Sequence, residues 1–139
     1  DEAAIIIRSI PHEEIQHHLA LADLGLLLRD RSSVNRVASP VKFAEYLACG
    51  VPVLVTPGVG DCPDIVRREG VGYLLDADLP LSRIVSEIRA NRSDFRARCR
   101  EVATRYFDGD AYRALYGELV GGKAFRRLPE SPSVGKACA

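Results

Sequence analysis

The chain has 139 residues, of which 47% are hydrophobic and 27% are charged, and its formal net charge is zero. This length predicts a single domain that can bury roughly two-thirds of its unfolded surface. Zero net charge gives no case for nucleic acid or an acidic membrane as a bulk electrostatic partner. The apolar runs are far shorter than the ~20 residues of a membrane span, so we expect neither a transmembrane segment nor a signal peptide.

The first half of the chain alternates between strand and helix patterns. Residues 3–9 form a β-branched run that predicts a strand, and residues 11–22 follow as an amphipathic helix with an acidic first turn. Residues 24–28 are a continuous apolar run of strand length, typical of a parallel strand that helices cover on both faces. A polar loop at 29–38 then leads to a helix over 39–50.

The second half predicts two more strands and a helical end. Residues 51–56 and 70–75 are apolar runs of strand length, joined by a glycine-rich turn at 57–61 and a short helix at 62–69. This order predicts right-handed βαβ units, and hence an α/β, Rossmann-like parallel sheet of about four strands with flanking helices. The rest is expected as a helical C-terminal part at 81–90, 93–106 and 110–120, followed by a loose tail at 122–139.

The helix over 39–50 carries the most informative pattern. Ser39 is expected to cap it, Pro40 suits the first helical position, and Gly50 suits the left-handed residue that ends it. Lys42 adds a cation to a helix end that is already electropositive, which suits the binding of an anion, phosphate above all. Glu45 follows on the same face, so that phosphate near Lys42 and hydroxyls near Glu45 would fit a nucleotide or a sugar phosphate. The alternative is a surface ion pair between the two, worth roughly 0.2–0.5 kcal/mol.

The segment Ser39-Pro-x-Lys-x-x-Glu45-Tyr-Leu-Ala-x-Gly-x-Pro-Val53 resembles the donor-binding helix of the retaining GT-B glycosyltransferases, the "glycosyl transferases group 1" family. The resemblance runs from about residue 5 to about residue 119. It implies transfer of a sugar, of the hexosyltransferase type, from a nucleotide-diphosphate donor to an acceptor. By position, Glu45 matches the glutamate that holds the ribose hydroxyls. The helix start, with Ser39, Val41 and Lys42, matches the turn that faces the diphosphate.

Two details of the resemblance concern the residues that would contact the donor sugar. Many members have a second glutamate eight residues earlier that contacts the donor sugar, but this chain has Val37 there, as in a subgroup that carries Ser-Pro-x-Lys. In the family, the loop that matches 57–61 lies beside the sugar, so Gly58, Gly60 and Asp61 are expected as sugar-binding residues. A lone Gly-x-Gly is weak evidence, and a plain tight turn is the favoured alternative from spacing alone.

The resemblance also implies missing parts. The family's two opening strands, with the arginine and lysine that neutralise the leaving diphosphate, have no counterpart here. Residues 1–121 are therefore expected as a partial donor-binding domain that is not catalytic alone, and its catalytic residues stay unknown. A missing N-terminal domain would bind the acceptor, a glycan, lipid or small molecule. The setting would be cytoplasmic, at the inner face of a membrane through that domain. No cofactor is implied beyond the nucleotide-sugar donor.

Without the opening strands, the strand at 24–28 has an open edge. We expect residues 3–9 to move inward and pair with it in the same chain, because the helix between them is a βαβ crossover of ordinary length. The alternative is pairing between molecules, which would give a homodimer. A non-catalytic, Rossmann-like assembly module is the rival interpretation of the whole chain.

The remaining polar residues give weaker signals. The four cysteines have no C-x-x-C spacing and the three histidines form no His-x-x-x-His pair, so we expect reduced thiols and no metal site. Arg29, Arg31 and Arg36 flank the loop at the carboxyl end of a strand, where open parallel sheets bind ligands. One of them could contact phosphate, and solvated loop charge is the alternative, favoured for Arg31. The arginine-rich helix at 92–105 is expected as a solvated face rather than a nucleic-acid site.

Overall fold

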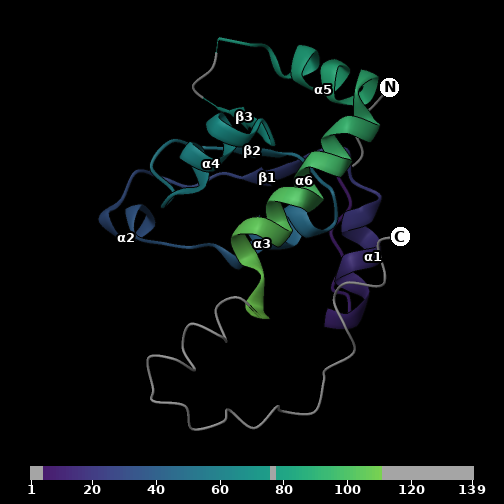
Figure 1. Cartoon of the computed structure of the whole chain (residues 1–139), viewed down its shortest axis with the longest axis horizontal. Coiled ribbons are helices and arrows are strands. Elements are labelled where there is room, and N and C mark those ends of the chain that lie inside the picture. Colours follow the sequence, from purple (N-terminus) through teal and green to yellow (C-terminus); the bar gives the residue numbers. More distant parts are fainter. Residues whose placement is uncertain (1–4, 76–77, 111–139) are drawn as a thin grey trace, which may run out of the picture.

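The computed structural model of the chain describes residues 5–75 and 78–110. Three parallel strands form one sheet in the order β1 (Gly25–Leu27), β2 (Val53–Val55) and β3 (Gly72–Leu74). The α/β class and the parallel arrangement are thus confirmed (Figure 1). The helices are η1 (His12–Glu14), α1 (Ile15–Ala20), α2 (Ser33–Arg36), α3 (Val41–Ala48), α4 (Cys62–Glu69), α5 (Leu81–Ala90) and α6 (Arg92–Phe107).

The two faces of the sheet contribute to separate hydrophobic clusters. Val53 and Val55 of β2 belong to the larger cluster, with buried side chains from α3, α4 and α6. Leu54, which alternates with them along the strand, belongs to the smaller cluster with Ile84 and Ile88 of α5. The long helix α6 runs alongside α3 in Figure 1. The helices therefore sandwich β2, which lies in the middle of the sheet.

Helix α3 ends as predicted but begins one residue later. Gly50 has φ of 72°, its N–H donates to Leu47 C=O (2.9 Å) and the Val51 N–H donates to Tyr46 C=O (2.8 Å), which together form a Schellman motif. At the other end, Pro40 occupies the cap position with an extended ψ of 120°, and no side chain of a described residue caps the helix. The prediction that Ser39 is the N-cap is therefore wrong, because the extended Pro40 leaves Ser39 one residue outside the cap.

The predicted fourth strand is also wrong. Residues 5–10 form no regular structure, and Ile5, Ile6 and Ile7 are 87%, 72% and 91% exposed. The reason lies in β1, where Leu26 is 53% exposed and the expectation that helices cover both faces fails. The smaller cluster contains Leu54 of β2, with Tyr73 of β3 packed against it, but it does not include Leu26. A further strand beside β1 would therefore bury little of the surface of the isoleucines at 5–7. Strand β1 is consequently an edge strand.

The other predicted elements agree closely with the structure. The bounds of α4 and α5 match the predicted helices, and the predicted helix over 11–22 is divided between η1 and α1. The loop predicted at 29–38 contains the short helix α2. The predicted helix at 110–120 lies outside the described residues except for its first residue, which is helical, and the tail and the domain boundary at 121 lie wholly outside them. Within those residues, no helix is long and apolar enough to span a membrane.

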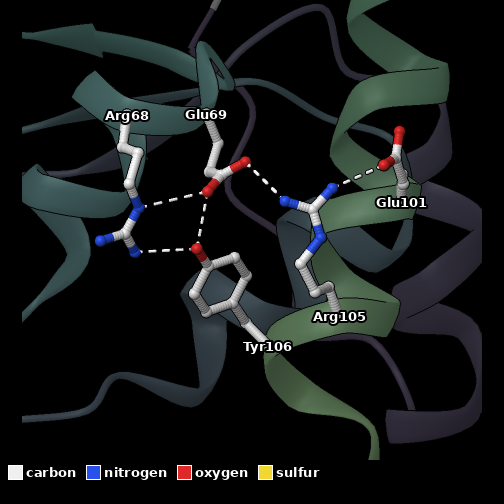
Figure 2. Close-up of polar contacts among 5 residues, drawn as sticks. All are labelled: Arg68, Glu69, Glu101, Arg105 and Tyr106. Carbon is white, nitrogen blue, oxygen red and sulfur yellow. Dashed lines mark hydrogen bonds and ion pairs between the residues drawn. The ribbon is translucent and has the colours of Figure 1, made fainter.

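A network of hydrogen bonds and ion pairs links the end of α4 to α6 (Figure 2). Glu69, whose side chain is 14% exposed, accepts hydrogen bonds from the Tyr106 hydroxyl at 2.6 Å, from Arg105 at 2.9 Å and from Arg68 at 3.2 Å. Arg105 also binds Glu101 on its own helix. The hydrogen bond from Tyr106, together with the two guanidinium groups, lowers the pKa of Glu69 below its usual value. Part of the arginine-rich surface of α6 thus stabilises the packing of the two helices.

Candidate functional site

The loops after β1 and β2 meet at the carboxyl edge of the sheet, where open parallel sheets bind ligands. The Thr56 hydroxyl accepts from the Arg29 N–H (2.9 Å) and donates to the Arg29 C=O (2.8 Å), which joins the two loops just beyond their strands. In Figure 1 the loop after β1 leads to α2 on the left, away from α1 on the right, and the loop after β2 leads to α4. The sheet edge is therefore a shared surface of the two loops.

Asn35 organises the loop after β1. This residue is 7% exposed, and its amide nitrogen donates to the Asp30 C=O (2.9 Å) and carboxylate (2.8 Å), while its amide oxygen accepts from Arg29 (3.2 Å). The Asn35 backbone N–H donates to Ser32 Oγ, which caps α2. Its backbone C=O accepts from the Gly60 N–H (2.9 Å), in the loop after β2. Since a buried amide is costly to leave without partners, this network holds the loops in one conformation.

Sequence reasoning missed Asn35. The available signal was the spacing of Ser32 and Asn35, which matches an N-cap serine and the residue whose N–H it accepts. This signal predicts the short helix, but the contacts with Asp30 and Gly60 depend on how the loop folds.

The two glycines of the turn after β2 have different surroundings. Gly60 has φ of 50°, and a Cβ there would lie 1.9 Å from the Ala38 carbonyl oxygen, so the close packing of the two loops requires glycine. Gly58 has φ of 83°, but a Cβ there would meet no atom of a described residue within 4 Å. Gly60 thus shapes the site from inside the protein, whereas Gly58 faces open space.

A surface cleft lies between the two loops, and Gly58 is part of its wall. The cleft has a volume of about 530 Å³. Of the residues predicted to bind the donor, Gly58 is the one that lines it, and two of the three candidate loop arginines, Arg31 and Arg36, line it as well. Its lining residues are Arg31, Ser32, Ser33, Arg36, Pro57 and Gly58.

The start of α3 carries four more of the residues that were predicted to bind the donor. Lys42 is exposed in the first turn and Glu45 is half-buried, and neither side chain forms an ion pair or hydrogen bond with another described residue. The surface pair considered above is thus not formed. Ser39 and Val41 are exposed, Val41 by 71%, so that the helix start is open to solvent. None of these four residues lines the cleft.

The residues at the start of α4 contribute differently. Asp61 is exposed in the cap position of α4 without a side-chain cap bond, and Asp64 forms an ion pair with Arg67 (3.3 Å). Burial, with the neighbouring Asp61 charge, raises the pKa of Cys62 to about 12, so this thiol stays protonated and is no nucleophile. Among residues 5–75 and 78–110, no three His, Cys, Asp or Glu side chains gather in a metal-binding group.

The chain was compared with protein-family models, with curated proteins and with solved structures, and none of the three comparisons gives a match.

Proposed function

We propose that this chain is the donor-binding part of a glycosyltransferase that transfers a sugar, with retention, from a nucleotide diphosphate to an acceptor. The observation that carries the proposal is the pair Lys42 and Glu45 on α3. Neither charge has a partner among the described residues, and none of their side chains caps the helix start. Stability alone would favour an acidic residue in this first turn, and an ion pair with Glu45 would have satisfied the lysine.

The roles follow from the chemistry of each group. Backbone N–H groups at the start of α3, near Ser39 and Val41, and the Lys42 ammonium would bind the diphosphate. Glu45, one turn deeper, would accept hydrogen bonds from the two ribose hydroxyls. The sugar would lie toward the turn at 58–61, where Gly58 leaves space, Gly60 fixes the turn and Asp61 offers a carboxylate.

The proposed activity also needs an acceptor site and cations for the leaving diphosphate, which other polypeptide segments would supply. The acceptor, a glycan, lipid or small molecule, would bind to an N-terminal domain, and the two opening strands that the resemblance implies would bring the cations that stabilise the leaving diphosphate. The described residues contribute binding and orientation of the donor. The reaction would take place in the cytoplasm, and at the inner face of a membrane where the acceptor is a lipid.

Calorimetric titration with UDP, GDP, UDP-glucose and GDP-mannose tests the proposal. We expect one nucleotide series to bind, and Glu45→Ala to weaken that binding by about 1.5–3 kcal/mol without unfolding the domain, because a charged hydrogen bond to a hydroxyl is lost. Glu13→Gln, an exposed carboxylate on η1, is the control that should bind like the wild type. Equal affinity of Glu45→Ala and wild type for the bound nucleotide would refute the assignment.

The second candidate is a non-catalytic module that assembles through β1. The observation that favours it is the open strand edge with Leu26 and Leu28 half exposed, together with the exposed isoleucines at 5–7. Sedimentation velocity should then show a homodimer that Leu26→Lys dissociates. A monomer at all concentrations, with nucleotide binding intact, would refute the assembly module and favour the donor-binding proposal.

A further inference from the structure

The cleft between the loops after β1 and β2 carries positive charge that the donor-binding proposal does not use. Arg31 and Arg36 both line it, and neither guanidinium has an ion pair or hydrogen bond with any described residue. The third arginine of this loop, Arg29, is instead held by the Asn35 amide oxygen at 3.2 Å. Two of the three loop arginines are thus available to a ligand, including Arg31, for which solvated charge was the favoured prediction.

The acidic residue nearest in sequence does not neutralise this pair. Asp30 lies beside Arg31 in the chain, but its carboxylate accepts a hydrogen bond of 2.8 Å from the Asn35 amide. Among the described residues that line the cleft, none is an aspartate or a glutamate. Two exposed like charges on one cleft repel each other, and an anion between them would relieve that repulsion.

The uncharged lining residues suit the same ligand. The Ser32 oxygen accepts from the Asn35 N–H at 3.2 Å, which leaves its own hydroxyl proton to be donated. Ser33, an exposed residue, adds a second hydroxyl, and the open space at Gly58 lets a ligand approach the backbone. The network around buried Asn35 fixes the loop that bears these groups, so the site is organised before the ligand arrives.

We propose that this cleft binds an oxyanion of a small ligand, a phosphate or a carboxylate, between Arg31 and Arg36. Guanidinium groups bind such oxygens through paired, charge-assisted hydrogen bonds, and the serine hydroxyls donate to the remaining lone pairs. The volume of about 530 Å³ is that of a small-molecule site. This site is separate from the start of α3 and does not require that the ligand be a nucleotide sugar.

The test is a titration of the full chain with sodium phosphate, sodium glucuronate and glucose at low ionic strength, followed by NMR of the backbone amides. Phosphate or glucuronate should bind, glucose should not, and the shifted amides should include those of residues 31–36 and 58. Whichever anion binds more tightly identifies the source of the oxyanion. Raising the salt concentration should weaken the binding.

Arg31→Gln/Arg36→Gln should lose at least about tenfold in affinity, because each substitution removes a charged hydrogen bond. Arg83→Gln, an exposed arginine on α5 without a described partner, should bind like the wild type. If the double variant does not fold, the affinities of the two single variants are measured instead. Failure of both anions to bind, amide shifts elsewhere, or equal affinity of the arginine variants and wild type would overturn the proposal. If neither the UDP series nor the GDP series binds while the anions still do, only the donor-binding function is refuted.

Discussion

The two glycines of the turn after β2 offer a matched experiment on how the loops pack. Both have positive φ, so alanine at either site adopts a left-handed conformation that costs about 1–2 kcal/mol. Alanine also lowers the conformational entropy of the unfolded chain, which offsets about 0.4–1 kcal/mol of that loss of stability. At Gly58, where a Cβ meets nothing within 4 Å, the net loss of stability should be about 1 kcal/mol.

Gly60→Ala should be much worse, because its Cβ would lie 1.9 Å from the Ala38 carbonyl oxygen. The loops would have to separate, which breaks the Gly60 to Asn35 hydrogen bond and loosens the network around the buried amide. We expect a loss at least ~2 kcal/mol larger than for Gly58→Ala, from strain and from the unsatisfied buried groups. Urea unfolding followed by far-UV circular dichroism measures both, since the chain has no tryptophan. Equal losses in the two variants would refute the close contact of the loops.

Two further substitutions test the electrostatics. Lys42→Glu should raise the stability of the domain by about 0.3–1 kcal/mol, because a carboxylate suits the start of α3, yet it should weaken nucleotide binding. A lower melting temperature with unchanged binding would make Lys42 structural. Tyr106→Phe removes the hydroxyl that lowers the pKa of Glu69. Since that stabilisation is complete above the unfolded pKa and is lost as the pH falls through the lowered folded value, the stability difference from wild type should be largest near neutral pH. It should shrink in acid below the ordinary value of 4.5, and a difference that does not vary with pH would contradict the role of Glu69.

The elements that the sequence predicts well carry their own end signals. Gly50 and Gly70 both take the left-handed conformation that ends α3 and α4, and Pro80 directly precedes α5. Such signals act within one or two turns of the chain, and they need no tertiary contact. The helix bounds and the parallel strands were therefore accessible from local patterns.

The errors arise where the outcome depends on distant residues. The β-branched run at 5–7 predicts a strand, but a strand there is buried only if a covering layer lies over that side of the sheet, and the 53% exposure of Leu26 shows that the described helices do not cover that face of β1. The cleft likewise depends on Asn35 and on the contact of Gly60 with Ala38, which join loops that are separate in sequence. Composition could mark the loop arginines as candidates, but only the folded loop distinguishes the bonded Arg29 from Arg31 and Arg36.

Amide shift mapping of the chain with UDP and GDP locates any nucleotide on the fold. If α3 binds the donor, the amides that shift on addition of one of them should include those of residues 41–45, with smaller shifts at 58–61. The same titration on Glu45→Ala should need a higher nucleotide concentration for the same shifts. Shifts confined to α5 and α6, or no shift with either nucleotide, would contradict the assignment of α3 as a nucleotide-sugar site.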